Sequence, residues 1–469
     1  MPTHTANEDF RLSLWQRVRE FAVPPAMIET ATARRLTGDW AGACAAAGFD
    51  VDLDLRTVAR DHGRELADLV RADLRRLAPD LLRWHLPRIA PDGLLRPGTT
   101  LALARYERAG PGPAHLVART PPAWADAGQR ISLALRAGPR DGSRRESGGR
   151  YPHPHPQPRF RLDLHRHLWD AGRSAELRVR SGADRPPAEG DPAVPVPPGG
   201  GFAVHRWAAE AAILLRAEER SAGRVAVRLG GGRTLVLDVA PDGAGPTGVR
   251  LTVVPDAVRA GALPVLPHAA TWVPPDLELL RAGAITADRL HPLVAAALAP
   301  GQHGSGPGRV TERPGGPGEV ECRGARHRIG LVDGALAALD HDPAEVRREE
   351  LLAALGGPPL PCLQAIDAAH RHPECLPGIR ERLDHGDVAG ALAVVEGLLG
   401  PAALLRDGPL HDELAAAAQR RIDHGLFRAG LVAGPAPAPA SGRVRPDRRR
   451  RSEDRRSRPR LAESRFRFR

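Results

Sequence analysis

Histidine and aspartate alternate in the stretch GRYPHPHPQPRFRLDLHRHLWD, which covers residues 149–170. If residues 160–168 form a strand, Asp163, His165 and His167 share one face of it, because successive side chains of a strand point to opposite sides. One carboxylate and two imidazoles form a ligand set that zinc and other divalent ions accept. The stretch is therefore a candidate site for a divalent metal. The alternative is a polar, solvated strand face.

A second group of metal-ligating residue types lies in the C-terminal third of the chain. Its members are Cys362, His370, His372, Glu374 and Cys375. Their spacing matches no zinc knuckle or finger, and about two helical turns separate Cys362 from His370. We therefore interpret Cys362 as a small core residue of a helix, with metal binding as the alternative.

Cys322 and His327 fall in one expected hairpin and could form a nucleophile–base pair, with Asp340 or Asp342 nearby. Such a pair is activated only when the histidine holds the thiol in its thiolate form. A cysteine on a strand beside an exposed histidine is usually inert. The chain contains no G-x-S-x-G motif, and we predict no catalytic centre.

Two further motifs resemble binding loops only in part. Asp50, Asp52 and Asp54 alternate as in an EF-hand, but Leu55 and Asp61 stand where that loop needs Gly and Glu. We expect Asp52 and Asp54 to cap the following helix. Residues 243–248 read G-x-G-x-x-G, but a strand rather than a helix is expected to follow. Without a helix N-terminus there is no dipole to hold a pyrophosphate, so a loop is expected there.

Lysine is absent from the chain, and all 67 positively charged side chains are arginine. Walker A loops, protein kinases and S-x-x-K enzymes each need a lysine, and pyridoxal phosphate needs an amine. The chain alone can carry out none of these reactions, and no cofactor is predicted beyond a divalent metal. The 50 Gly and 47 Pro indicate a GC-rich coding sequence. Arginine content is therefore not in itself evidence for nucleic-acid binding.

Most of the net charge of +11 lies at the C-terminal end of the chain. Residues 441–469 hold 13 Arg against four acids, a net charge of +9, so the first 440 residues carry only +2. Residues 433–469 are expected to form a disordered basic tail. The tail could bind nucleic-acid phosphates or an acidic partner electrostatically. Its candidate binding residues are Arg448, Arg449, Arg450, Arg451, Arg455 and Arg456.

Changes in hydrophobic period divide the chain before this tail into regions. Residues 1–92 are predicted to form a helical module, in which apolar side chains from Leu66 to Leu82 recur at three- and four-residue steps. Residues 98–299 are predicted to be a mixed, β-rich region with long Pro/Gly loops, and residues 300–318 a linker. Residues 319–432 are predicted to form a β-hairpin followed by helices. The expected fold class is therefore α+β.

Within the β-rich region, alternation of apolar and polar residues predicts individual elements. Strands are expected at residues 99–106, 131–136, 160–168 and 175–180. A helix is expected at residues 202–219, a hairpin at residues 225–239, a third strand at residues 249–254, and short helices at residues 275–299. Asp333–Gly334 is expected to turn the hairpin of the C-terminal module, and Asp342 and Pro343 to begin the helix after it.

Residues 35–43 (RLTGDWAGA) and residues 382–391 (RLDHGDVAGA) share a Gly-Asp pair between two apolar helical stretches. Each predicts a tight αα turn in which the glycine ends one helix, the aspartate caps the next, and a small alanine lets the helices approach. The turn resembles that of a tetratricopeptide helix pair, which implies a peptide-binding surface. The 34-residue repeat of that family is absent, so a generic helical hairpin is the alternative.

The N-terminal segment has no apolar core of a secretory signal, and no stretch approaches the ~18 apolar residues of a membrane span. With four cysteines and no C-x-x-C pair, a reduced cytosolic protein is expected. The absence of a catalytic constellation and the helical hairpins favour an accessory protein that binds a protein partner. The alternatives are a metal-dependent hydrolase using Asp163, His165 and His167, and a nucleic-acid regulator acting through the tail.

Overall fold

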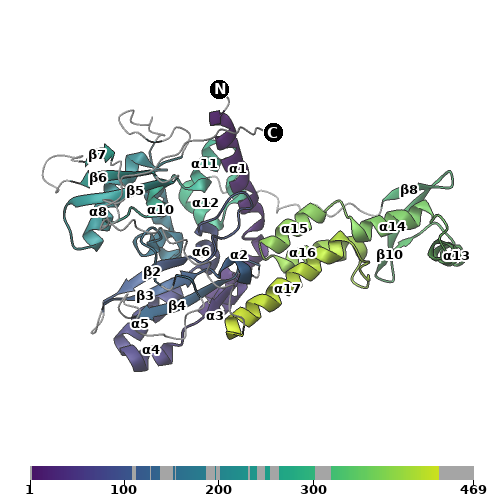
Figure 1. The fold of residues 1–469 in the computed structure, drawn as a ribbon, viewed down its shortest axis with the longest axis horizontal. Helices are drawn as coiled ribbons and strands as arrows, with labels where there is room; N and C mark the ends of the chain where they lie inside the picture. The colour runs from purple at the N-terminus through teal and green to yellow at the C-terminus, as the bar shows by residue number, and fades with distance from the viewer. Residues whose placement is uncertain are drawn as a thin grey trace, which may run out of the picture. The chain divides into compact units, whose positions relative to one another are not determined.

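The computed structural model describes most of the chain before the basic tail (Figure 1). The described residues are 3–107, 112–126, 128–137, 151–153, 155–185, 196, 201–230, 233–239, 249–253, 263–301 and 318–431. Side chains are described from residue 10 onward, apart from those of residues 249–253. The G-x-G-x-x-G loop at 243–248 and the tail at 433–469 lie outside these residues. All elements below belong to the unit Met1–Val432.

Six helices form most of the N-terminal region, as predicted. They are α1 (Thr3–Phe21), α2 (Pro25–Leu36), α3 (Trp40–Ala46), α4 (Leu55–His62), α5 (Arg64–Arg76) and α6 (Pro79–His85). Their apolar stripe lies inside, because Leu66, Val70 and Leu74 of α5 are all buried. Pro79 begins α6, and Leu86 adopts an extended conformation before Pro87, which ends the helix.

The first sheet has four strands in the order β1-β4-β3-β2. The strands are β1 (Phe49–Val51), β2 (Thr100–Tyr106), β3 (Ala114–Arg119) and β4 (Ile131–Ala137). The predicted strands at 99–106 and 131–136 are confirmed, whereas β1 and β3 were not expected. Strand β1 comes from the helical region and pairs in parallel with β4. One hydrophobic core runs from Val18 to Leu298, so the expected boundary at residues 92–98 does not separate two cores.

The second sheet is the antiparallel meander β5-β6-β7, which confirms the hairpin and the third strand predicted for this region. Its strands are β5 (Gly223–Gly230), β6 (Arg233–Val239) and β7 (Val249–Val253). Helix α8 (Val204–Ala217) covers it, with Trp207 and Leu214 in their shared core. Three short helices follow: α10 (His268–Thr271), α11 (Pro275–Arg281) and α12 (Pro292–Leu298).

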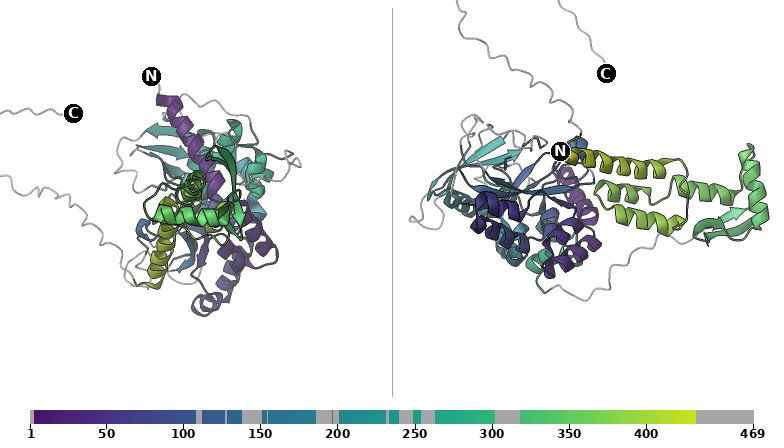
Figure 2. Two further views of the ribbon diagram at one scale, coloured as in Figure 1. Left: turned by 90° about the vertical axis from the view of Figure 1, so that its right-hand side faces the viewer. Right: turned by 90° about the horizontal axis from the view of Figure 1, so that it is seen from below.

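The C-terminal module combines a three-stranded sheet, β8-β9-β10, with five helices (Figure 2). Its elements are β8 (Glu319–Cys322), β9 (Ala325–Val332), β10 (Ala335–Ala338), α13 (Pro343–Ala354), α14 (Pro361–Arg371), α15 (Leu376–Asp384), α16 (Val388–Leu399) and α17 (Pro409–Ala429). Asp333 and Gly334 both have positive φ, as the predicted turn requires, and Asp342 caps α13. The chain therefore has an α+β fold, as predicted. None of the described helices combines the length and apolar character needed to cross a membrane.

Both predicted αα turns form, and they do so in the same way. In the first, Gly38 has φ +81° and the Asp39 carboxylate accepts a hydrogen bond of 2.8 Å from the backbone of Gly42. In the second, Gly386 has φ +87° and Asp387 accepts one of 2.9 Å from Gly390. The alanines that follow, Ala43 and Ala391, are completely buried where the helices meet. The two hairpins belong to different cores and do not form a repeat array.

The strands predicted at 160–168 and 175–180 are wrong. Residues 160–170 instead form the short 3₁₀ turns η2 (Leu162–Leu164) and η3 (Arg166–Leu168), and residues 171–181 form η4 (Ala171–Glu176) and α7 (Leu177–Ser181). The segment folds back because its side chains pair locally. Arg161 binds Asp163 two residues away, and the indole of Trp169 donates to the carbonyl of Leu162 at 3.0 Å. These local contacts take the place of the backbone hydrogen bonds that a strand would make to a neighbouring strand.

The acidic residues around β1 hold the last helix of the C-terminal module. Asp54 caps α4, as expected, by accepting from Thr57 at 2.9 Å. Asp52 does not cap a helix, because it binds Arg119 of β3 and Arg428 of α17, the latter at 2.6 Å. Asp50 lies 3.2 Å from the imidazole of His424, also on α17. Asp50 and Asp52 therefore dock α17 against β1, whereas Asp54 is a helix cap.

A candidate ligand-binding cavity

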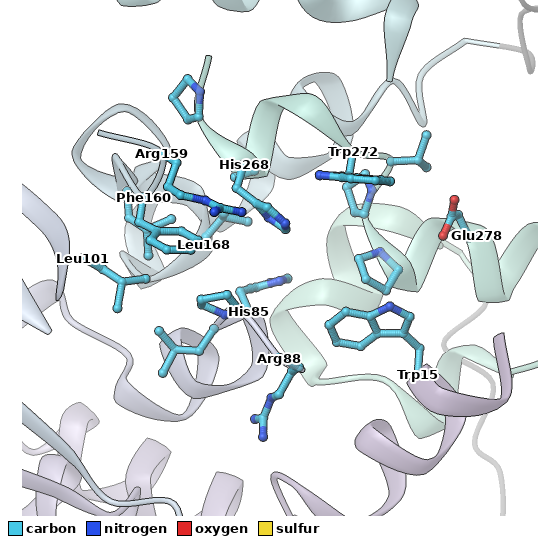
Figure 3. A pocket seen from close by; sticks show the side chains of 18 of the residues that line it. Trp15, His85, Arg88, Leu101, Arg159, Phe160, Leu168, His268, Trp272 and Glu278 are labelled. Atoms are coloured by element: carbon cyan, nitrogen blue, oxygen red, sulfur yellow. The ribbon is translucent and has the colours of Figure 1, made fainter. Parts of the chain in front are cut away.

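A cavity of about 370 Å³ lies inside the region formed by residues 10–278 (Figure 3). Helix α1, the end of α6, the segment around Phe160 and helices α10 and α11 line it. The labelled side chains in the figure are Trp15, His85, Arg88, Leu101, Arg159, Phe160, Leu168, His268, Trp272 and Glu278. A cavity of this size and mixed lining is typical of small-molecule sites.

Prolines place several of these side chains at helix ends. His85 is the last residue of α6, which Pro87 ends two residues later. Pro267 precedes His268, the first residue of α10. Because a helix stops or starts at these positions, the imidazoles project from backbone ends rather than from a packed helix face. In Figure 3 both His85 and His268 reach toward the middle of the cavity.

Aromatic rings form much of the cavity wall. Phe202 stacks behind Trp272 with ring centroids 4.3 Å apart. His268 lies 6.0 Å from Trp272 and 5.9 Å from Phe160, so a row of rings runs along one side. Trp15 of α1 stands across from Trp272 in Figure 3. Flat apolar groups pack well against such walls.

The histidines of the cavity are held neutral. Burial lowers the pKa of His85 to about 3 and that of His268 to about 4, with nearby Arg159 adding to the effect on His268. Burial also lowers the pKa of His167 well below its ordinary value. The His85 Nε2 and His167 Nδ1 atoms are buried and have no hydrogen-bond partner among the described residues. Neutral imidazoles supply one donor and one acceptor each, so these atoms are available to a ligand.

Arg159 is one of two cavity cations, with Arg88, that have no carboxylate partner among the described residues. Its pKa is lowered by burial and by Arg96 and Arg228, and no carboxylate pairs with it in the described part of the chain. The guanidinium lies 5.0 Å from the ring centroid of Phe160. Its Nε–H is buried and has no hydrogen-bond partner among the residues that the structure describes. A half-buried charge without a counter-ion is partly desolvated, so an anion arriving here would recover that cost.

Several other arginines of the cavity are paired with carboxylates. Arg180 and Arg206 both bind the buried carboxylate of Glu210, and Arg11 binds Glu278. Burial would raise the pKa of Glu210, but hydrogen bonds from His165 and Arg180 hold it well below its usual range. Glu210 is therefore a fixed counter-ion for its neighbours. Arg88 donates only to the carbonyls of Arg83 and Gly93, so it too lacks a carboxylate partner in the described residues. Arg159 is the one that lies against the aromatic wall, beside Phe160.

The structure does not bring Asp163, His165 and His167 together as three ligands. Both oxygens of Asp163 accept from Arg161, at 2.8–3.0 Å. His165 lies 3.1 Å from Glu210 through Nε2, and only His167 lines the cavity. The two imidazole centroids are 5.8 Å apart. The predicted row fails because the segment is not a strand.

The C-terminal group of predicted ligands does not converge either. Cys362 is buried at the start of α14, whereas His372 and Glu374 are exposed beyond the other end of that helix. Cys322 is buried as well, and the imidazole within reach of Cys362 is that of His341, at 3.5 Å. In the described residues, Cys322, His341 and Cys362 are the side chains that converge as metal ligands would.

Sequence reasoning missed the cavity because its residues are far apart in the chain. Positions 15, 85, 159, 268 and 272 share no local spacing. The sequence did contain one indication of the cavity, because His85 and His268 each lie within two residues of a proline at a helix end. A histidine side chain at such a position is not packed against its own helix. In comparisons with protein-family models, curated proteins and solved structures, no match to this chain was found.

Proposed function

We propose that the chain is a binding protein for a small organic anion with a flat, apolar body. The observation that carries the proposal is the uncompensated Arg159 guanidinium, placed beside unpartnered histidine nitrogens in an aromatic cavity. The anionic group pairs with Arg159 and accepts from the imidazoles. The apolar body fills the space between Trp15 and Trp272.

The volume of the cavity and the charges of its side chains restrict the class of ligand further. A cavity of about 370 Å³ holds a molecule of one or two rings. The histidines are neutral near pH 7, so the positive charge that the site offers a ligand comes from arginine rather than from the imidazoles. Aromatic and heteroaromatic carboxylates meet these conditions. The neutral imidazoles also give the carboxylate oxygens directional donors.

The test compares an aromatic acid with its uncharged amide. We expect indole-3-carboxylate to bind the full-length protein at least ten-fold more tightly than indole-3-carboxamide, measured by calorimetry and tryptophan fluorescence. Arg159→Met should lower the affinity for the carboxylate by about 10- to 100-fold, because a hydrogen bond to a charged group contributes roughly 1.5–3 kcal/mol. It should leave the amide almost unchanged.

The matched control is Arg75→Gln, which removes a charge from the exposed face of α5. This variant should bind the acid as the unchanged protein does. Trp272→Leu should lower the affinities for the acid and for the amide by similar factors, because it removes an apolar contact rather than a charge. Equal affinity for acid and amide, or no binding of either at millimolar concentration, would contradict the proposal.

A second candidate function is binding of a cytosolic protein partner through α13. This helix buries none of its residues, and it exposes Leu351 and, at its end, Leu355, which is 87% exposed. Exposed apolar groups gathered on one helix commonly mark protein interfaces. The tail-based alternative rests on residues 433–469, outside the described part of the chain, and gains no support here.

This candidate is tested by purifying the tagged protein from its native cells with nuclease present. A partner bound through α13 should co-elute in stoichiometric amount, and the double variant Leu351→Ser/Leu355→Ser should lose it. Arg347→Gln, which changes an exposed charge on the same helix, should retain it. Recovery of the same partner by the double variant would exclude α13 as the binding surface.

A further inference from the structure

We propose that the C-terminal module binds one zinc ion through Cys322, His327, His341 and Cys362. Three of the ligand atoms already converge: those of Cys322, His341 and Cys362 all lie within 4.8 Å of one another. Two thiolates and two imidazoles form a common ligand set of structural zinc sites. The site is separate from the cavity and independent of its ligand.

The spacing of the ligand atoms fits tetrahedral coordination. The Cys362 Sγ and His341 Nε2 atoms are 3.5 Å apart. Ligands at the usual Zn–S and Zn–N lengths of about 2.3 and 2.05 Å, with a tetrahedral angle between them, are about 3.6 Å apart. A single ion can therefore sit between this thiol and this imidazole without displacing either backbone.

Local structure aims each ligand at the same point. Cys322 ends β8, where Arg323 and Gly324, both with positive φ, turn the chain into β9. Cys362 follows Pro361 in the first turn of α14. Both sulfur atoms belong to fully buried residues. A hairpin and a helix start, 40 residues apart in sequence, thus present two thiols to one another.

His341 has the surroundings of a metal-bound imidazole. Its Nε2 faces Cys362, while its Nδ1 lies 3.7 Å from a carboxylate oxygen of Glu345. Arg323 holds that carboxylate in place with a hydrogen bond of 2.6 Å. Histidine ligands commonly direct the nitrogen that does not bind metal toward a carboxylate, which fixes the ring.

His327 supplies the fourth ligand. Its ring stacks on His341 with centroids 4.2 Å apart and planes only 10° from parallel. Its Nδ1 is buried and has no hydrogen-bond partner in the described part of the chain. An unpartnered buried nitrogen is costly, and coordination to the same ion would satisfy it. His327 does not belong to the group that already converges, so its bond to the ion requires a change of its side-chain torsions.

The surrounding core is too small to hold the sheet and α14 together by itself. Its buried members are Cys322, Leu360 and Cys362. Two of these three are proposed ligands. Helix α13, which Arg323 contacts through Glu345 and Glu349, buries no residue. Small modules with little core are commonly held by metals or disulfides. The ligand spacing, C-x4-H-x13-H-x20-C, differs from the short knuckle spacings by which zinc sites are usually identified.

Metal content of the unaltered full-length protein is the first test. Protein made in zinc-supplemented medium and purified without chelator should contain one zinc per chain. After exchange with Co²⁺, it should show the visible bands of tetrahedral cobalt and a thiolate charge-transfer band for two sulfur ligands. Less than 0.2 zinc per chain after supplementation, or a cobalt spectrum without thiolate bands, would overturn the proposal. Neither measurement depends on whether a variant folds.

Variants then assign the ligands. Cys322→Ser and Cys362→Ser should each release the zinc, whereas Cys44→Ser and Cys375→Ser, which change the other two cysteines, should retain it. His327→Asn should lower the affinity for zinc at least ten-fold, measured in competition with a chromogenic chelator. Its cobalt form should keep the charge-transfer band of two thiolates. If Cys375→Ser loses as much metal as Cys362→Ser, the assignment is wrong.

Discussion

Lowering the pH from 7 to 5 is expected to unfold the body of the protein. Four histidines resist protonation in the folded state, of which His167 and His385 are buried and His85 and His268 half-buried. Burial lowers the pKa of His85 to about 3 and those of His268 and His385 to about 4, and burial also lowers that of His167. In the unfolded chain each titrates near 6.5.

The direction of the effect follows from which state binds protons. Below about pH 6.5 the unfolded chain takes up protons that the folded chain excludes, so the free energy of unfolding falls as the pH falls. Between pH 7 and 5 each histidine contributes a loss of about 2 kcal/mol. Several such losses approach the ~5–15 kcal/mol stability of a typical protein. Burial raises the pKa of Asp126, which opposes the trend only near the acid end.

Urea unfolding at pH 7, 6 and 5, followed by circular dichroism, measures this effect. The slope of stability against pH should correspond to about four protons between pH 6 and 5. His268→Asn should reduce the slope by about one proton, whereas His62→Asn, at an exposed position on α4, should not change it. A slope below one proton would mean that the histidines are accessible to protons in the folded state.

Replacing Arg83 by leucine is expected to cost roughly 3–6 kcal/mol of stability, because it leaves several buried carbonyls without donors. Arg83 is 1% exposed. Its guanidinium donates to the carbonyls of Ala22, Gln129 and His385, at 3.1, 2.6 and 2.8 Å. These carbonyls belong to the end of α1, a loop before β4 and the C-terminal module. Burial lowers the pKa of Arg83 to about 10, so it stays charged at neutral pH.

The same substitution should loosen the C-terminal module from the body. Limited proteolysis of Arg83→Leu should cut α15 and α16 faster than in the unchanged protein. Arg83→Lys should recover little, since one ammonium cannot reach three carbonyls arranged for a planar fork. Arg75→Leu, on an exposed face, should change stability by no more than about 0.5 kcal/mol. A loss below 1 kcal/mol for Arg83→Leu would show that the carbonyls find other donors.

Local patterns predicted the elements whose causes are local. The Gly-Asp turns at Gly38 and Gly386 form as expected because a positive φ and a cap need only neighbouring residues. The Asp333–Gly334 hairpin forms for the same reason. Strand β3 was missed, and residues 160–168 were predicted to be a strand. In residues 160–168, polar and apolar residues alternate as in a strand. The polar residues Arg161 and Asp163, however, pair with each other within the segment, and the segment does not join a sheet.

The sites depend on tertiary contacts and could not be predicted as sets. From the sequence, Cys322 and His327 were considered as a catalytic pair. Cys362 was considered as a metal ligand together with residues at the far end of its own helix. The structure instead unites Cys322 with Cys362 and adds His341, which no hypothesis contained. In the cavity, the decisive property is that Arg159 lacks a counter-ion, and absence of a partner cannot be read from spacing.

The contacts between β1 and α17 have a consequence for synthesis of the chain. Asp50 and Asp52 meet His424 and Arg428 across 374 and 376 residues of sequence. At ~5–20 residues per second, a ribosome needs roughly 20–75 s to make that intervening chain. Once Tyr151 has been made, and until Phe427 follows it 276 residues later, the surface formed by Ala125 and Tyr151 has no cover from Phe427. The nascent protein therefore exposes an apolar site to chaperones until its last helix has been made.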